Sequence, residues 1–379
     1  MFFRIEQRLL VFIINCFVLT YAFAAADKPF IATDIASFDE PWALAFLPDG
    51  RLLVTEKKGK LLIVSQDGKK IGPVSGVPEV DYGGQGGFGD VMPHPDFENN
   101  NVIYLSYVEA GQDNKRGAAV IKAQLVINSE GGALSDIEVI WRQNPKVTGR
   151  GHYGHRLIFS DNGYLFISSG DRQKFDPAQN MKANLGKIIR LHDDGSIPSD
   201  NPFIEHGGIT SQIWSLGHRN PLGIAFDEDG QLWNIEMGPE GGDELNRVVR
   251  GENYGYPIVS NGDHYDGRDI PDHPTRPEFT PPKTWWTPVI SPSAFIIYSG
   301  DLFANWKGMG FITGLSSESL VRIEFNGENA HEAERFDMGG RIRSIRQGPN
   351  GGIWILEDGR NSNKSRLLKL VPRQEKSIH

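Results

Sequence analysis

Residues 42–54 read WALAFLPDGRLLV, an apolar run at 42–46, a turn at Asp49-Gly50 and a second apolar run at 52–54. Asp-Gly supplies the positive φ angles that a tight hairpin turn requires. The segment therefore predicts a β-hairpin, two strands joined by a short turn.

The same pattern recurs along the chain, with Asn-Gly in place of Asp-Gly in two copies. The further copies are 155–159 with Asn162-Gly163 and 164–167, 223–226 with Asp229-Gly230 and 232–233, and 342–345 with Asn350-Gly351 and 353–356. Two weaker strand groups, 101–107 and 311–325, bring the number of units to six. A repeated strand unit of this kind is typical of propellers and other radial β-structures.

Six units divide the chain after residue 24 into segments of roughly 59 residues, the size of a four-stranded blade with one long loop. We therefore predict an all-β fold, a six-bladed β-propeller of four-stranded antiparallel blades formed by residues 25–379 as a single domain. A β-sandwich, or two sandwiches, would show similar short strands and remains the alternative. The 44 Gly and 23 Pro among 379 residues argue against a coiled coil or helical bundle.

Residues 1–24 have the pattern of a secretory signal peptide. Arg4 and Arg8 accompany an apolar run at 9–21, which closes on small residues at Ala22 and Ala24. The run is too short for a permanent anchor, so we expect an exported, periplasmic protein without stable membrane insertion. The only cysteine, Cys16, lies inside this run, and the mature chain is expected to fold without disulfides.

Charge excludes another class of function. The chain has 39 basic and 48 acidic residues, a net charge of -9, which repels nucleic acids and anionic lipids. We expect no nucleic-acid partner.

Three short segments carry candidate catalytic or binding residues. His152 precedes a predicted strand, where a histidine can serve as a general base near neutral pH. Arg219 and Asn220 open another repeat and can bind carboxylates and amides. Arg341 and Arg343, two apart on a strand, face the same side, and an anion between them would relieve their repulsion. Taken singly, each segment also fits a surface or turn role.

Residues 236–244 combine acidic side chains with the carbonyl groups of Gly238 and Pro239. Such an oxygen-rich stretch suits Ca²⁺, although its spacing is not that of an EF-hand, and a solvated acidic turn is the alternative. The Gly-rich turn around Gln85 lacks the spacing and the lysine of nucleotide-binding loops.

Together these segments resemble the soluble PQQ-dependent aldose sugar dehydrogenases of the glucose/sorbosone dehydrogenase family. The resemblance is carried by LGKIIRL at 185–191 with DGSIP at 194–198, by LGHRNP at 216–221 and by the stretch 236–246, in the same order along nearly the whole mature chain. It implies a six-bladed propeller with pyrroloquinoline quinone (PQQ) over the mouth of its channel.

The resemblance also implies a role for individual residues. His152 would be the general base, and Arg219 would assist catalysis. The residues in positions that contact PQQ are Gln85, Arg219, Asn220, Tyr265, Arg341 and Arg343. Gly238 and Pro239 would bind the Ca²⁺ of the cofactor through their carbonyls, and Glu244 and Tyr254 would bind a further Ca²⁺.

The implied reaction is the oxidation of the anomeric C1 hydroxyl of an aldose sugar to a lactone, with hydride transfer to PQQ. Electrons would then pass to an external acceptor, a quinone, a cytochrome or a dye, and the protein would be a monomer or homodimer. A Ca²⁺-dependent lactonase and a binding propeller without redox activity are the alternatives.

Three positions depart from the pattern of the family. Gly151 stands where glucose-oxidising members have an acidic residue, Met237 replaces a glutamine, and Ser317 lies near a missing cofactor-binding lysine. Each departure weakens cofactor binding or shifts the choice of substrate.

Overall fold

The structure is a computed structural model that describes residues 28–359 and 365–374. The predicted signal peptide at 1–24 lies outside this range. Within it the fold is all-β, as predicted, with a single short α-helix, α1 (Phe97–Asn100), and a few 3₁₀ turns. None of the helices in these two stretches has the length and apolar character needed to cross a bilayer.

Most strands of the described chain belong to four-stranded sheets or to one eight-stranded sheet. In spatial order, the eight-stranded sheet contains β2 (Pro41–Phe46), β3 (Leu52–Glu56), β4 (Lys60–Val64), β5 (Lys70–Ser75), β9 (Gly131–Arg142), β8 (Arg116–Asn128), β7 (Val102–Ala110) and β6 (Phe88–Pro93). The parallel pairing of β5 with β9 that joins its halves involves only Val74 with Gly132 and Ser75 with Ala133.

The four-stranded sheets follow in chain order, and the last takes its outer strand from the start of the chain. They contain β10 (Gly154–Phe159), β11 (Leu165–Ser169), β12 (Lys187–Leu191) and β13 (Ile213–Leu216); β14 (Pro221–Phe226), β15 (Leu232–Glu236), β17 (Asp243–Arg247) and β19 (Thr284–Trp286); β20 (Pro292–Ile297), β21 (Gly310–Gly314), β22 (Ser319–Asn326) and β23 (Asn329–Asp337); and β24 (Ile342–Gln347), β25 (Ile353–Glu357), β26 (Arg366–Pro372) and β1 (Phe30–Ser37). A two-stranded ribbon pairs β16 (Glu240–Gly241) with β18 (Gly262–Asp263).

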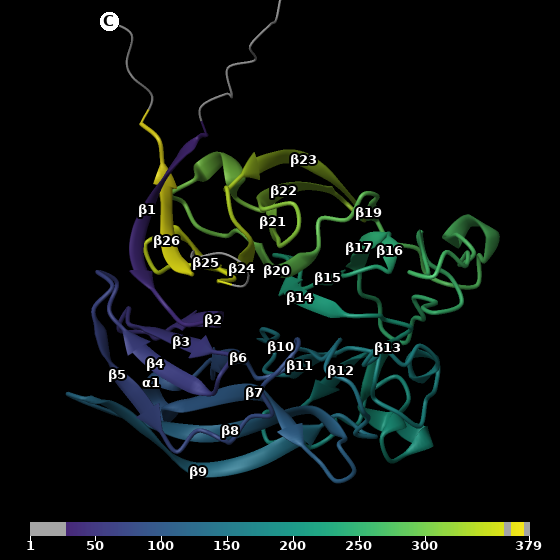
Figure 1. Cartoon of the computed structure of the whole chain (residues 1–379), viewed down its shortest axis with the longest axis horizontal. Coiled ribbons are helices and arrows are strands. Elements are labelled where there is room, and N and C mark those ends of the chain that lie inside the picture. The colour runs from purple at the N-terminus through teal and green to yellow at the C-terminus, as the bar shows by residue number, and fades with distance from the viewer. Residues whose placement is uncertain (1–27, 360–364, 375–379) are drawn as a thin grey trace, which may run out of the picture.

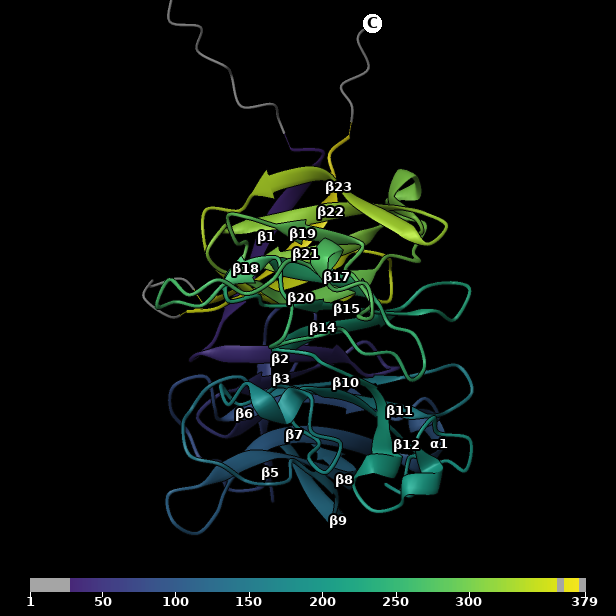
Figure 2. The same cartoon turned by 90° about the vertical axis from the view of Figure 1, so that its right-hand side faces the viewer.

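The first strand of each repeat lies nearest the centre of the molecule. Figure 1 shows β2, β6, β10, β14, β20 and β24 around this centre, and each contacts the next, with β24 contacting β2. The antiparallel pairing of β1 with β26 joins the two ends of the described chain and closes this arrangement. Figure 2, turned by 90°, places β22 and β23 at one end of the molecule and β8 and β9 at the other.

The four hairpins predicted from the sequence are confirmed. Phe46 pairs with Leu52, Phe159 with Leu165, Phe226 with Leu232, and Gln347 with Ile353. The glycines of their turns, Gly50, Gly163, Gly230 and Gly351, have φ angles of 86°, 82°, 75° and 76°. The glycine of each turn therefore supplies a positive φ angle as the sequence indicated, whereas the Asp or Asn before it does not.

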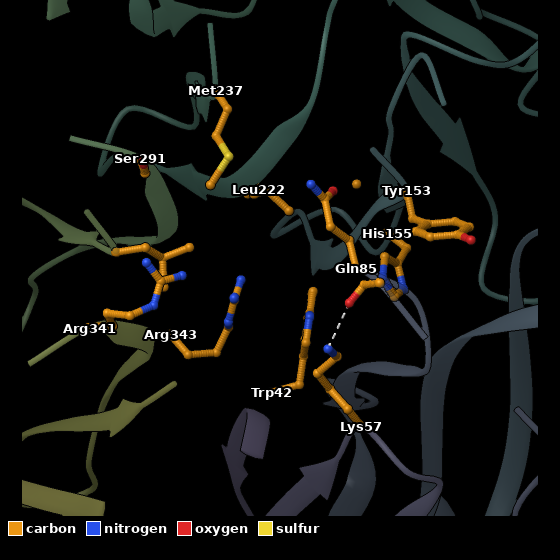
Figure 3. A pocket seen from close by; sticks show the side chains of 13 residues that line it. Trp42, Lys57, Gln85, Tyr153, His155, Leu222, Met237, Ser291, Arg341 and Arg343 are labelled. Carbon is orange, nitrogen blue, oxygen red and sulfur yellow. Dashed lines mark hydrogen bonds between the residues drawn. The ribbon is translucent and has the colours of Figure 1, made fainter. Parts of the chain in front are cut away.

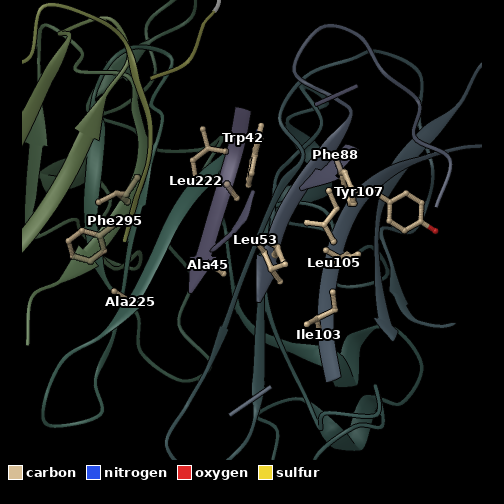
Figure 4. Packing of buried hydrophobic residues seen from close by; sticks show 14 of the residues in the cluster. Trp42, Ala45, Leu53, Phe88, Ile103, Leu105, Tyr107, Leu222, Ala225 and Phe295 are labelled. Carbon is tan, nitrogen blue, oxygen red and sulfur yellow. The ribbon is translucent and has the colours of Figure 1, made fainter. Parts of the chain in front are cut away.

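Apolar side chains fill the space between the sheets. In one buried cluster, Trp42 and Leu53 from the eight-stranded sheet pack with Leu222 of β14 and Phe295 of β20 (Figure 4). Because neighbouring sheets share such clusters, their packing holds the central strands in place.

Every central strand has a register shift close to its beginning. The shifts lie between Pro41 and Ala43, Phe88 and Val91, Gly154 and Leu157, Pro221 and Gly223, Pro292 and Ala294, and Ile342 and Ser344. A β-bulge of this kind redirects the residue that it leaves unpaired. Trp42, Asp90, Arg156, Leu222, Ser293 and Arg343 all lie within these shifts.

Arg156 connects these six bulges. Its guanidinium donates to the carbonyl oxygens of Leu222 (2.7 Å), Ser293 (2.6 Å) and Arg343 (3.2 Å). It also lies 3.9 Å from the centre of the Trp42 ring and 3.5 Å from Asp90 Oδ1. Arg156 is 2% exposed, so these contacts form away from solvent.

We predict that Arg156→Met lowers the free energy of unfolding by about 3–5 kcal/mol, because it removes one partner of a buried ion pair and leaves carbonyl groups unsatisfied. Urea denaturation measures the loss. Arg142→Met removes a half-exposed arginine paired with Glu109 and should cost less than about 1 kcal/mol. Equal effects of the two substitutions would contradict the central role of Arg156.

Candidate active site

A pocket of about 140 Å³ opens at the end of the ring where the central strands begin. Trp42, Leu222 and Arg343, all contacted by Arg156, belong to its lining. Figure 3 shows Arg341 and Arg343 on one side and Gln85 with His155 on the other. Of the residues predicted to bind the cofactor, Gln85, Arg341 and Arg343 line this pocket together. The sequence did not single out Lys57 and Trp42, which also line it.

His152, the predicted base, is buried beside this pocket. Its backbone N–H donates to Gln85 Oε1 (2.8 Å), and its Nδ1 lies 2.7 Å from Asp171 Oδ1. Asp171 is fully buried and was missed by the sequence reasoning. One signal was available in the sequence: His152 lies just before the first strand of a predicted hairpin, and Asp171 lies just after the second. The start of the first strand and the end of the second lie side by side in a hairpin, so the two residues are brought together.

The environment keeps His152 neutral. Burial lowers its pKa below the ordinary 6.5, the hydrogen bond with Asp171 opposes this shift, and the positive charge of Arg219 adds to it. With its Nδ1 proton donated to Asp171, the ring carries its lone pair on Nε2. His152 is therefore ready to accept a proton at neutral pH.

Arg219 and Asn220 have polar atoms without partners. Arg219 Nη1 donates to the Met237 carbonyl (2.9 Å), but within the described residues its Nε has no hydrogen bond. The same holds in the described chain for both side-chain atoms of Asn220, which is fully buried. Because buried polar groups are normally paired, these atoms are candidates for hydrogen bonds with a polar ligand. Tyr265 is 72% exposed, with its ring centre 5.8 Å from the Arg219 guanidinium.

Arg341 and Arg343 share an anion that belongs to the protein. Arg341 Nε donates to Asp358 Oδ2 (3.0 Å), and Arg343 Nε donates to Oδ1 (2.7 Å). Burial opposes ionisation of Asp358, but the two arginines lower its pKa. The expectation that a ligand must separate the arginines was therefore incomplete, although one net positive charge remains beside the pocket.

The predicted calcium ligands lie on and after β15 and β17. The Gly238 N–H donates to Asp243 Oδ1 (2.9 Å), and burial raises the pKa of Asp243 to about 6. Glu244 is buried 3.6 Å from His273, and burial raises its pKa. The Tyr254 hydroxyl donates to the Arg247 carbonyl and accepts the Val249 N–H, so backbone groups of the protein already occupy it.

No group of three or more His, Cys, Asp or Glu side chains suited to a metal occurs in the described ranges. Sites built from the carbonyls of Gly238 and Pro239 are of a different kind, and Pro239 is buried beside Gly238.

The structure gives physical reasons for two of the departures. A Cβ atom at Gly151 would lie 2.4 Å from Gln173 Oε1, so Gln173 occupies the space of the missing acidic side chain. Ser317 Oγ hydrogen-bonds with Ser319 Oγ (2.7 Å) and donates to the Ile290 carbonyl (3.2 Å). The third departure, Met237, lines the pocket.

The chain is similar over most of its length to known sugar dehydrogenases. The family model described as Glucose / Sorbosone dehydrogenase matches residues 38–369. Aldose sugar dehydrogenase YliI of Escherichia coli is 40% identical over 345 residues, which cover 88% of this chain and 91% of the relative.

Solved structures extend the likeness to the fold. The soluble aldose sugar dehydrogenase of Escherichia coli in its apo-form has a TM-score of 0.84 and 37% identity, covering 91% of this chain and all of that one. The PQQ-bound aldose sugar dehydrogenase of Streptomyces coelicolor has a TM-score of 0.73 and 26% identity, covering 91% and 98%. The resemblance predicted from the sequence is confirmed.

His155, on the wall of the pocket, generates a prediction about stability. Burial lowers its pKa from 6.5 to about 3, so the folded protein binds fewer protons than the unfolded chain. The resulting stability is fully present above pH 6.5 and is lost as the pH falls toward 3. Between pH 7 and pH 5 the loss amounts to about 2 kcal/mol for one histidine.

We predict that His155→Gln removes this part of the pH dependence. Urea unfolding of the wild type and the variant at pH 7 and pH 5 measures the change in the free energy of unfolding. His152 contributes equally to this change in the two proteins. If the free energy of unfolding changes by the same amount between pH 7 and pH 5 in the variant as in the wild type, His155 is not the source of the pH dependence.

Proposed function

Because the chain belongs to the glucose/sorbosone dehydrogenase family, we propose that it is a quinoprotein that oxidises the C1 hydroxyl of aldose sugars to lactones. The observation that carries the proposal is the buried His152–Asp171 pair beside a pocket with excess positive charge, which Arg341 and Arg343 line. Arg219 and Asn220, outside the lining, add polar atoms that have no partner within the described residues. The family match and the sugar dehydrogenases among its relatives support the same reaction.

We infer a six-bladed propeller for residues 25–379, with the eight-stranded sheet counted as two blades. Support comes from the brief pairing of β5 with β9 and from the contacts that run round the central strands. A single closed ring would place all six bulges at one mouth, where the pocket lies.

The residues present fit PQQ, a tricarboxylate. Arg341 and Arg343 together exceed the charge of Asp358, and Asn220 has an unpaired donor and acceptor in the described chain. Gln85, Arg219 and Tyr265 would complete the set of cofactor contacts. Gly238 and Pro239 would hold the Ca²⁺ of the cofactor, and Glu244 with the Tyr254 carbonyl would hold the further Ca²⁺.

In this mechanism His152 Nε2 accepts the proton of the C1 hydroxyl, and Asp171 fixes the tautomer that makes Nε2 basic. When bound, PQQ with its Ca²⁺ supplies the acceptor for the hydride that leaves C1. Loss of the proton and hydride converts the cyclic hemiacetal into a lactone. Arg219 contributes a fixed positive charge beside His152 and stabilises negative charge that develops during the reaction.

We further propose export through residues 1–24 and a periplasmic location. The pattern of two arginines, an apolar run and small residues supports this location. Electrons would pass to an external quinone, cytochrome or dye, and the protein would act as a monomer or homodimer.

The experiment that tests the function is dye reduction by the purified protein with a panel of aldoses, with and without PQQ and Ca²⁺. We predict that activity requires both additions and that His152→Ala lowers kcat by roughly 10²- to 10⁴-fold. His331→Ala removes an exposed histidine and should leave kcat unchanged. Activity without PQQ, or full activity of His152→Ala, would contradict the proposal.

Asp171→Asn tests the positioning of the base. Because Asp171 raises the pKa of His152, its loss should move the acidic limb of the kcat profile to lower pH while kcat falls at least about tenfold. A pH–rate profile of both proteins measures the shift. A shift to higher pH would show that Asp171 does not act through His152.

A further inference from the structure

The backbone of Phe175 is hydrogen-bonded to the carboxylate that also contacts the proposed base. Its N–H donates to Asp171 Oδ2 (3.2 Å), while Asp171 Oδ1 contacts His152 Nδ1. Asp171 Oδ1 also accepts the Gln173 N–H (3.0 Å). The same carboxylate therefore both orients the proposed base and fixes the backbone of the loop that follows β11, including the backbone at Phe175.

The backbone of Phe175 is strained. Its φ and ψ angles are 61° and -84°, a γ-turn region that bulky residues rarely adopt. Arg172 and Gln173, in the same loop, also have positive φ angles of 60° and 57°. Strain of this kind persists mainly at functional sites, where the surrounding structure enforces it. Despite this cost, the Phe175 ring is 42% exposed.

The exposed ring belongs to a group of aromatic side chains around Arg219. Phe175 meets His264 edge-on, with ring centres 5.5 Å apart, and its centre lies 6.4 Å from that of Tyr256. The Arg219 guanidinium lies 5.8 Å from the ring centres of both Tyr256 and Tyr265. The loop after β11 and the loops after β17 thus bring aromatic side chains together beside Arg219, one of the residues proposed to act on the sugar.

A pyranose ring presents flat patches of C–H groups, which pack favourably on aromatic faces. We propose that the exposed ring of Phe175 is the platform against which the sugar lies while its C1 hydroxyl meets His152. This inference rests on the proposed function and adds a residue that sets the affinity for the substrate. Phe175 contributes to sugar binding and leaves the binding of PQQ unaffected.

The test compares Phe175→Ala, Phe175→Leu and Phe175→Tyr in the protein loaded with PQQ and Ca²⁺, with glucose, xylose and maltose as substrates. The alanine and leucine variants should raise KM roughly tenfold with kcat changed less than about twofold, and tyrosine should restore KM. Calorimetric titration of each apo-protein with PQQ should give the wild-type affinity. Leucine keeps the apolar volume without a flat face, so it serves if the alanine variant does not fold.

Leu302→Ala is the matched control, because Leu302 is also 42% exposed but belongs to a different loop, between β20 and β21, and not to the aromatic group around Arg219. Its KM should equal that of the wild type. An active wild type with unchanged KM in Phe175→Ala and Phe175→Leu would overturn this inference alone, as would lower PQQ affinity in both. A wild type inactive with PQQ and Ca²⁺ would overturn the proposed function and this inference with it.

Discussion

The contacts of Arg156, on β10, with the other five central strands are the constraint on which the rest of the structure depends. One guanidinium can reach carbonyls of β14, β20 and β24, the Trp42 ring of β2 and Asp90 of β6 only if the strands converge on it. The bulges near the start of each central strand make this convergence possible. Asp90 is bound in turn by Arg346, so the charge at the centre is shared by a buried network.

The site is built on this centre. Trp42, Leu222 and Arg343 contact Arg156 on one side and line the pocket on the other. His152 stands two residues before β10, the strand that carries Arg156, and Asp171 follows β11, its hairpin partner. The proposed base and its carboxylate therefore take their positions from the same hairpin that anchors the ring, which favours a rigid geometry for the proposed proton transfer.

The sequence predicted those features that depend on local chemistry. The hairpins followed from Asp-Gly and Asn-Gly turns. The positions of His152 and Arg219 at the openings of repeats made them candidates, and the resemblance to the family implied their roles, which stay predictions. It did not predict Asp171, Asp358 or the role of Arg156, because these depend on contacts fixed by ring closure. Arg156 and Arg343, for example, are 187 residues apart. Asp358 is an example of what the sequence could not predict. The two arginines at 341 and 343 indicated a nearby anion, but only the folded chain shows that Asp358 is one.

The central claim is that the site binds an anionic quinone and that Asn220, whose amide atoms have no partner within the described residues, is one of its contacts. Titration of the apo-protein with PQQ in the presence of Ca²⁺, followed by quinone absorbance, tests it most directly when repeated with Asn220→Ala. The account predicts saturable binding with one PQQ per chain, weakened at least about tenfold in the variant, which loses both unpaired amide atoms. Absence of saturable binding, or equal affinity of the two proteins, would contradict it.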